Sequence, residues 1–247
     1  MSDADDKNRK HEERLAEWAK SGKEGTKPVN AATVILLRDT DGDGDLETLM
    51  LRRNSKIAFG GMWVFPGGRV DDADREGLAE DDELGAARRA AVREAHEESG
   101  LDISEADLAA LSHWTPPPIT PKRFLTWFFV AEAPESEVVI DQGEIEDHVW
   151  LSVREALDRR DQGEIELAPP TFVTLQWLAA HRSVGDAVED ARNREPEFFS
   201  TRIAVSDDGP VAMWQGDAGY EASDANVDGA RHRLSMHKGV WTYERSE

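Results

Sequence analysis

The chain has 247 residues, of which 39% are apolar, and this is enough for one good-sized domain or for a domain with an extension. It contains no cysteine, so disulfides, thiolate zinc sites and cysteine nucleophiles are excluded. Its formal net charge of −22 disfavours binding to nucleic acid and to anionic membranes.

The N-terminal segment, residues 1–27, is polar and charged and lacks the alternation of a strand. We expect a polar tail or a loosely docked surface helix, with the folded domain starting at Pro28. The first residues lack the apolar core of a signal peptide, and no apolar run in the chain is long enough to span a membrane. The sequence therefore predicts a cytoplasmic protein.

Two apolar runs, residues 31–37 and 46–52, are typical of buried strands. The segment between them, residues 39–45, is rich in aspartate and glycine, as calcium-binding loops are. The position at which an EF-hand needs its last glutamate holds Met50, and strands rather than helices flank the segment. A hairpin turn at an Asp-Gly pair is the favoured interpretation.

Positive charge gathers at the end of the second strand, where Arg52, Arg53 and Lys56 lie. A guanidinium group matches the geometry of a phosphate, so these side chains could meet the phosphates of a substrate. The alternative is a solvated strand end whose arginines pair with nearby acids. The sequence leaves both interpretations open.

A strong helical pattern covers residues 84–99 and carries three carboxylates on one face. Glu94, Glu97 and Glu98 are spaced i, i+3 and i+4, so their side chains project together. Like charges crowded on one turn repel one another, and a bound Mg²⁺ or Mn²⁺ removes the conflict. The alternative is a solvated acidic face, which is common in acidic chains. Arg93 lies four residues before Glu97 and can orient its carboxylate.

The residues around these carboxylates complete a longer pattern. A Pro-Gly-Gly turn at residues 66–68 precedes the helix, which ends in the order Arg-Glu-x-x-Glu-Glu-x-Gly-Leu at residues 93–101. This pattern resembles the signature of the Nudix hydrolases. The matching residues are Gly68, Arg93, Glu94, Glu97, Glu98, Gly100 and Leu101.

The first half of the pattern departs from the family. The motif usually places its glycine fourteen positions before its arginine, whereas Gly68 and Arg93 are 25 positions apart. The connection is therefore about eleven residues longer, and we expect an exposed acidic loop at residues 72–83. Counted back from the arginine, the middle glutamate of the motif falls on Gly85. The open alternatives for its role are Asp71, Asp74 and Glu83.

A proline-rich segment, residues 113–121, is expected to be a stiff, extended loop that lines a pocket or binds a partner. An aromatic strand follows at residues 125–130. Arg123 could contact a phosphate or could simply be a surface residue at the start of this strand. Trp127 could stack on a base or pack in the core.

Residues 141–151 resemble the Nudix stretch in which a glutamate precedes a strand that carries a tryptophan. In several members of the family, a residue of this loop completes the metal site or acts as the general base. Glu144 matches that position best, and Glu146 is the alternative. Two helices are expected next, one over residues 153–160 and one that starts at Pro169.

Beyond Pro196 the pattern changes to short strands around turn residues. Residues 201–205 and 211–214 flank one hairpin turn, and residues 231–236 and 240–243 flank a second. The predicted parts of the chain are a polar tail at 1–27, a Nudix hydrolase domain at 28–195 and a β-hairpin-rich extension at 196–247.

The resemblance implies an α+β Nudix fold, a mixed β-sheet sandwiched between α-helices, with a β-rich C-terminal extension. It also implies divalent-metal-dependent hydrolysis of a nucleoside diphosphate linked to a second group. Leu-Arg-Arg, a glycine and then Phe-Pro-Gly-Gly are similar to the branch that splits coenzyme A or acyl-coenzyme A at the diphosphate, although Ile57 departs from that branch. The alternatives are a pyrophosphatase of ADP-ribose, NADH or another nucleoside diphosphate derivative, and a Nudix-like sensor that binds a nucleotide without turnover.

These assignments define a candidate site. Catalytic roles are expected for Arg93, Glu94, Glu97, Glu98 and Glu144. The residues expected to hold Mg²⁺ or Mn²⁺ are Gly68, Glu94, Glu97 and Glu98. Substrate contacts are expected from Arg52, Arg53, Phe65, Gly67, Arg69 and Arg123. The expected partner is a nucleotide-type small molecule rather than a nucleic acid or a membrane, and the resemblance allows a homodimer because relatives often dimerise.

Overall fold

The computed structural model describes Glu13, Glu17 and residues 25–40, 45–54, 60–141, 143–237 and 239–246. Most of the predicted tail, the centre of the predicted turn at 39–45, Lys56 and Ile57 lie outside these residues. In the part of the chain that is described, no helix is long and apolar enough to cross a membrane.

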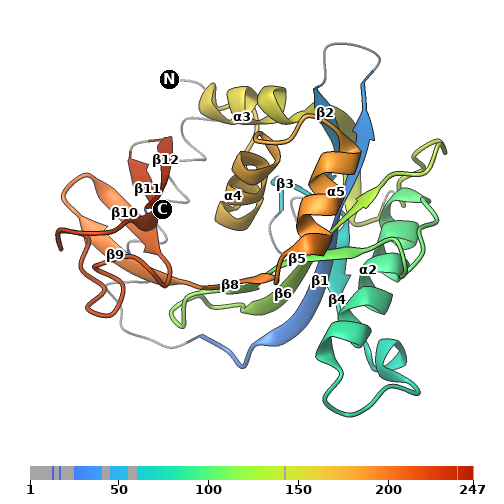
Figure 1. The fold of residues 1–247 in the computed structure, drawn as a ribbon, viewed down its shortest axis with the longest axis horizontal. Coiled ribbons are helices and arrows are strands. Elements are labelled where there is room, and N and C mark those ends of the chain that lie inside the picture. The colour runs from blue at the N-terminus through green and yellow to red at the C-terminus, as the bar shows by residue number, and fades with distance from the viewer. Residues whose placement is uncertain are drawn as a thin grey trace.

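The main body is built on one mixed β-sheet (Figure 1). Its strands are β1 (Val29–Asp39), β2 (Leu46–Arg53), β3 (Trp63–Val64), β4 (Gly67–Arg69), β5 (Ala109–Thr115), β6 (Phe124–Glu132), β7 (Ile145–Ser152) and β8 (Glu197–Ser200). They lie in the order β3-β2-β1-β6-β5-β8, with β4 paired to β1 and β7 paired to β2. The β1–β6 and β5–β8 pairs are parallel, and the other pairs are antiparallel.

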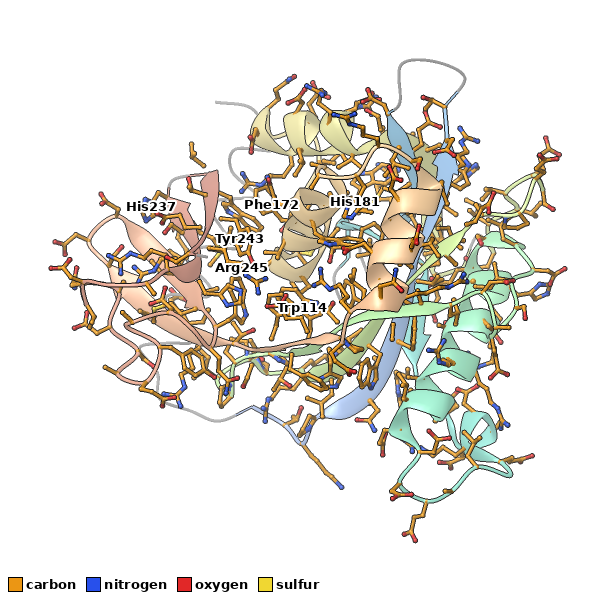
Figure 2. All side chains as sticks on the ribbon, in the orientation of Figure 1. Trp114, Phe172, His181, His237, Tyr243 and Arg245 are labelled. Carbon is orange, nitrogen blue, oxygen red and sulfur yellow. The ribbon has the colours of Figure 1, made fainter. Side chains whose placement is uncertain are left out.

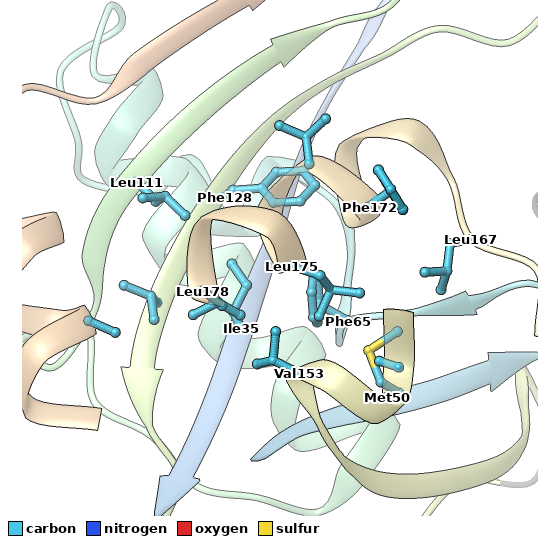
Figure 3. Close-up of a cluster of buried hydrophobic side chains, with 14 of the residues drawn as sticks. Ile35, Met50, Phe65, Leu111, Phe128, Val153, Leu167, Phe172, Leu175 and Leu178 are labelled. Atoms are coloured by element: carbon cyan, nitrogen blue, oxygen red, sulfur yellow. The ribbon is translucent and has the colours of Figure 1, made fainter. Parts of the chain in front are cut away.

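Helices cover both faces of this sheet (Figure 1). One face carries α2 (Glu83–Ser99), and the other carries α3 (Val153–Asp161), α4 (Pro169–Leu178) and α5 (Val184–Asn193). Successive side chains of β1 point to opposite faces of the sheet and so contribute to two cores. Val34 and Leu36 pack with the alanines of α2, whereas Ile35 packs with residues of α3, α4 and α5. Figure 3 shows Ile35 in the same cluster as Phe172, Leu175 and Leu178 of α4. The predicted mixed sheet between helices is confirmed.

The buried face of α2 is made of small residues, so this helix lies close to the sheet. The residues concerned are Ala86, Ala87, Ala90, Ala91 and Ala95. The helix begins where the side chain of Asp82 accepts a hydrogen bond from the N–H of Gly85 at 2.8 Å. It ends at Gly100, whose φ of 70° lies in the left-handed region that favours glycine.

The C-terminal segment forms a second sheet, which is four-stranded and antiparallel. Its strands are β9 (Arg202–Ser206), β10 (Gly209–Met213), β11 (His232–His237) and β12 (Val240–Arg245), in the order β12-β11-β10-β9. Both predicted hairpins, β9–β10 and β11–β12, are confirmed. The sheet meets the main body through aromatic residues, among them Trp114, Phe172 and Tyr243 (Figure 2).

Three details differ from the sequence-based expectation. The proline-rich segment begins as a strand, because β5 runs to Thr115 and is paired on both sides, by β6 and β8. The lengthened segment is not a loop throughout, since residues Asp72–Arg75 form a 3₁₀ turn, η1, in which Asp74 is buried. The helix α5 was not expected, because its pattern is mostly polar and only three of its residues are buried.

Candidate functional site

The Pro-Gly-Gly turn and the carboxylates of α2 meet at β4. This strand pairs with Ala31–Thr33 of β1, so its backbone is held by the sheet. The N–H of Gly67 donates a hydrogen bond to Oε2 of Glu98 at 2.9 Å. Glu98 is thereby tied to the sheet, and it is only 4% exposed.

Both glycines of this turn are needed because of close packing. A Cβ atom on Gly68 would lie 2.4 Å from Oε1 of Glu94. A Cβ atom on Gly67 would lie 2.4 Å from the main-chain oxygen of Ala32 in the neighbouring strand. Glycine at position 68 therefore leaves room for a carboxylate, and glycine at position 67 allows the two strands to pair.

Arg93 connects the groups around these glycines. Its Nε and Nη2 donate to Oδ1 and Oδ2 of Asp74 at 3.2 and 2.9 Å. Its Nη1 donates to Glu94 Oε1 at 2.8 Å and to Glu97 Oε2 at 2.9 Å, and its Nη2 also donates to the main-chain oxygen of Arg69 at 2.9 Å. The bonds to Asp74 above all raise the pKa of Arg93, so its guanidinium stays charged. The predicted contact between Arg93 and Glu97 is confirmed.

Of the three acids left open for the middle of the motif, Asp74 is the one that contacts Arg93. It is buried in η1, where Oδ2 also accepts the N–H of Asp71 at 2.9 Å. Glu83 forms its ion pair elsewhere, with Arg75. Of the three, Asp74 is therefore the acid that the structure places against Arg93.

A signal for Asp74 was present in the sequence. Counted forward from Gly68 instead of back from Arg93, the usual spacing of the motif falls on Asp74. The additional residues thus lie between Asp74 and Arg93, after the middle position of the motif rather than before it. The count back from Arg93 crosses the lengthened segment, and for this reason it falls on Gly85 instead of on an acidic residue.

Burial dominates the electrostatics of Glu98. Loss of solvent raises the pKa of Glu98 to about 8, against the lowering influence of the Gly67 N–H and of Arg53. The Nη1 of Arg53 lies 3.9 Å from Glu98 Oε1, which is too far for a hydrogen bond. That oxygen is buried and has no hydrogen-bond partner among the residues that the structure describes. Burial also raises the pKa of Glu94, with Arg93 opposing the rise.

Arg53 connects the carboxylates of α2 to the loop before β7. Its Nη2 donates to Oε2 of Glu144 at 2.8 Å, while its Nη1 faces Glu98. The carboxylate of Asp141 accepts the N–H of Glu144 at 3.0 Å and fixes the loop. The Glu144 side chain is 61% exposed. The structure therefore brings Glu144 to the α2 carboxylates, through a contact with Arg53 that no sequence pattern indicates.

Glu146, the alternative to Glu144, lies with Arg52 instead. The pairing of β2 with β7 shifts between Arg52 and Arg53, and Glu146 is the extra residue of this β-bulge. Its carboxylate lies 3.9 Å from Nε of Arg52, and that of Asp147 lies 3.7 Å from Nη2. Successive strand residues point to opposite faces of a sheet, so Arg53 shares the α2 face and Arg52 does not.

The remaining candidates for substrate contact are not gathered at the carboxylates. Phe65 is 3% exposed and packs in the core on the sheet face opposite α2. Arg123 directly precedes β6. Arg69 contributes its main-chain oxygen to the site, whereas its side chain is exposed. Among the predicted substrate residues, Gly67 and Arg53 are the ones that contact a predicted metal ligand.

The donor set fits a divalent cation. Carboxylate oxygens are the ligands that hard cations prefer, and burial, with a smaller contribution from the neighbouring carboxylates, raises the pKa of Glu94 and Glu98. In the described ranges, no three acidic or histidine side chains are already grouped as ligands of one ion. Instead, Glu94 and Glu97 accept hydrogen bonds from Arg93, and Glu98 accepts one from the N–H of Gly67. The buried Glu98 oxygen without a partner is the kind of atom that a bound cation satisfies.

Comparisons with known proteins identify the family of this chain. The family model of the NUDIX domain matches residues 27–172. The crystal structure of a NUDIX hydrolase from Alicyclobacillus acidocaldarius is similar, with 26% identity and a TM-score of 0.59, over 66% of this chain and 96% of that chain. No curated protein sequence matches the chain.

Two further structures have lower similarity. A MutT NUDIX hydrolase from Burkholderia pseudomallei has 19% identity and a TM-score of 0.45, over 61% of this chain and 98% of that chain. The NUDIX domain of Shewanella oneidensis NrtR, complexed with ADP ribose, has 18% identity and a TM-score of 0.47, over 73% of this chain and 97% of that chain.

The family match covers more than half of the chain and includes all the carboxylates and arginines of the site. Members of this family typically use divalent metals, which agrees with the donor set around Gly68. The chain therefore belongs to the NUDIX domain family and is a Nudix hydrolase.

Proposed function

We propose that this enzyme splits coenzyme A or an acyl-coenzyme A at the diphosphate. The observation that carries the proposed reaction is the meeting of Glu144 with the three α2 carboxylates beside Gly68, with Arg53 and Arg93 between them. The choice of substrate is supported by the sequence order Leu-Arg-Arg at residues 51–53, followed by Phe-Pro-Gly-Gly at residues 65–68.

The reaction needs bound cations because the substrate and the protein are both anionic. The diphosphate carries negative charge, and so does the chain, at −22. In the proposal, Mg²⁺ or Mn²⁺ is held by the carboxylates of Glu94, Glu97 and Glu98 and by the main chain of Gly68. A divalent ion bound there neutralises phosphate oxygens and makes water a better nucleophile at neutral pH.

Two other residues of the site have separate roles: one accepts a proton, and one positions the metal-binding carboxylates. Glu144 is the proposed general base, because its exposed carboxylate can reach solvent while Arg53 holds one of its oxygens. Arg93 is a positioning residue that sets the direction of Glu94 and Glu97. Contacts of the substrate with Arg52, Arg69 and Arg123 belong to the proposal, as do a cytoplasmic location and a homodimer.

The test is a hydrolysis screen in Mg²⁺ with coenzyme A, acetyl-coenzyme A, ADP-ribose, NADH and a nucleoside triphosphate. The test variant is Glu97→Gln, and the matched control is Glu155→Gln, an exposed glutamate of α3 that pairs with Arg159. We expect turnover of the coenzyme A compounds only. We expect kcat to fall about 100-fold in Glu97→Gln and to stay unchanged in the control.

Each other outcome has a distinct meaning. Turnover of ADP-ribose or NADH instead would keep the mechanism and reject coenzyme A as the substrate. Near-normal turnover by Glu97→Gln at saturating Mg²⁺ would show that the metal assignment is wrong. Tight binding of one compound without turnover of any would favour the nucleotide-sensing alternative.

A further inference from the structure

A pocket of about 290 Å³ lies on the α2 face of the sheet, beside the N-terminal half of α2. Its walls include Asn30, Val70, Glu83, Ala87, His113 and Trp127. None of these six belongs to the group of carboxylates and arginines described above. The pocket combines two flat rings with a carboxylate and an amide.

The carboxylate of this pocket comes from the lengthened segment between Asp74 and Arg93. Glu83 is fixed from two sides: Arg75 donates to its two oxygens at 3.2 and 3.0 Å, and the side-chain amide of Asn30 donates to Oε2. A carboxylate can accept about four hydrogen bonds, and these contacts use three. Glu83 is also half exposed, so one acceptor position remains for a ligand.

The opposite wall is aromatic. The rings of His113 and Trp127 lie 4.9 Å apart. Phe198, which is 60% exposed, lies 5.6 Å from each of them. Burial lowers the pKa of His113, so its ring is neutral at pH 7 and behaves as an apolar surface. Such a wall suits a flat ring, because stacking on an aromatic side chain stabilises each bound base.

The pocket is within reach of the carboxylate site by two independent measures. Val70 lies two residues beyond Gly68 along the chain, which is about 7 Å in an extended strand. Ala87 and Glu94 are seven residues apart on α2, so they share a face and are separated by about 10 Å along the helix axis. A sugar and one phosphate separate a nucleobase from the diphosphate bond of a nucleotide, and their length is comparable with these two separations.

We infer that this pocket binds the nucleobase of the substrate, as an amino-bearing purine, with the ring against Trp127 and the amino group donating to Glu83. The inference rests on the proposed function, because it takes the carboxylate site as the reaction centre. A carboxylate accepts from an amino group and repels a carbonyl oxygen, so Glu83 selects adenine over hypoxanthine. Specificity for the base then resides in a segment that the shorter form of the motif lacks.

The test measures binding rather than turnover. AMP and IMP are titrated calorimetrically in Mg²⁺ buffer into the full chain and into Glu83→Gln, with Glu80→Gln as the matched control from the same exposed segment. We expect the affinity for AMP to be about tenfold lower in Glu83→Gln than in the unaltered chain. The affinity for IMP should be at least as high as in the unaltered chain, because an amide can donate to the carbonyl of IMP. Glu80→Gln should bind both nucleotides as the unaltered chain does.

A second variant tests the aromatic wall. Trp127→Leu should lower the affinities for AMP and for IMP equally, by about tenfold, since every purine has a face to stack. Circular dichroism checks that this variant stays folded. Equal affinity of the unaltered chain for AMP and IMP, or equal weakening of both in Glu83→Gln, would overturn the inference. No measurable binding of AMP would overturn it as well. Hydrolysis that persists with an unchanged KM in both variants would reject this pocket and keep the proposed function.

Discussion

At the scale of single residues, the contact between Asp74 and Arg93 joins the two halves of the motif. Asp74 is buried and both its oxygens accept from Arg93, which in turn holds Glu94 and Glu97. Asp74→Ala would leave Arg93 without its anchor. We expect kcat to fall about 100-fold and the Mg²⁺ concentration for half-maximal rate to rise. Steady-state kinetics over a Mg²⁺ series measures both quantities.

The control for this prediction is Asp72→Ala, an exposed acid of the same 3₁₀ turn, which should keep full activity. Asp74→Glu restores a carboxylate at the position and should recover part of the rate. If Asp74→Ala turned over substrate like the unaltered enzyme, Arg93 would not depend on this contact.

Glu98 should make the stability of the metal-free protein depend on pH. Burial raises its pKa from about 4.5 to about 8, so the folded chain holds a proton that the unfolded chain releases. The stabilisation from this group is complete below about pH 4.5 and is lost as the pH rises through 8. We therefore expect Tm in EDTA to fall as the pH rises across this interval. Glu98→Gln cannot ionise, so its Tm should fall less, and identical slopes by scanning calorimetry would contradict the assignment.

The convergence of Glu94, Glu97 and Glu98 could be predicted because helical spacing alone decides which side chains share a face. The contact of Arg53 with Glu144 could not, since it joins residues 91 apart through a sheet pairing that no local pattern encodes. Asp74 could be predicted only by counting from Gly68. Motif spacing is informative within rigid elements and fails across a segment of variable length.

At the scale of elements, the packing of β4 between β1 and α2 gives the two glycines different roles. Gly68→Ala would push on the end of the Glu94 side chain, which can move, so we expect a folded protein with at least tenfold lower activity. Gly67→Ala would meet the backbone of β1, which cannot move, so we expect about 2 kcal/mol less stability. Thermal melts and activity assays of both variants separate the two effects. Equal loss of stability in the two variants would refute the distinction.

The same scale shows which elements a sequence can predict. β1 and α2 follow from their own residues, because each carries a long, uniform burial pattern. β5 and α5 do not, because β5 lacks a regular alternation and is paired with strands distant in the sequence, β6 and β8, and because only three residues of α5 are buried. An element whose burial is supplied by the rest of the chain leaves a weak local signal.

At the scale of the whole molecule, the C-terminal sheet completes the core of the main body. Phe199 of β8 stacks on Trp114 at 3.9 Å, and Arg160 of α3 lies over the ring of Trp241 at 4.1 Å. The predicted boundary between residues 195 and 196 therefore crosses packed aromatic side chains. We expect a chain that ends at residue 195 to lose its cooperative thermal transition and its near-ultraviolet circular dichroism. A cooperative melt of that shortened chain would establish residues 28–195 as an independent domain.

The contact between Asp74 and Arg93 has one more consequence. It closes a ring of chain in which 18 residues, 75–92, lie between two ends held by hydrogen bonds. The entropy of closing such a ring grows only with the logarithm of its length, so eleven additional residues cost on the order of 1 kcal/mol. Insertions and deletions are therefore tolerated in residues 76–82 of the ring, whereas residues 83–92 belong to α2 and set the direction of its carboxylates. Evolution, or a designer, can therefore change this short stretch while the contact between Asp74 and Arg93 stays in place.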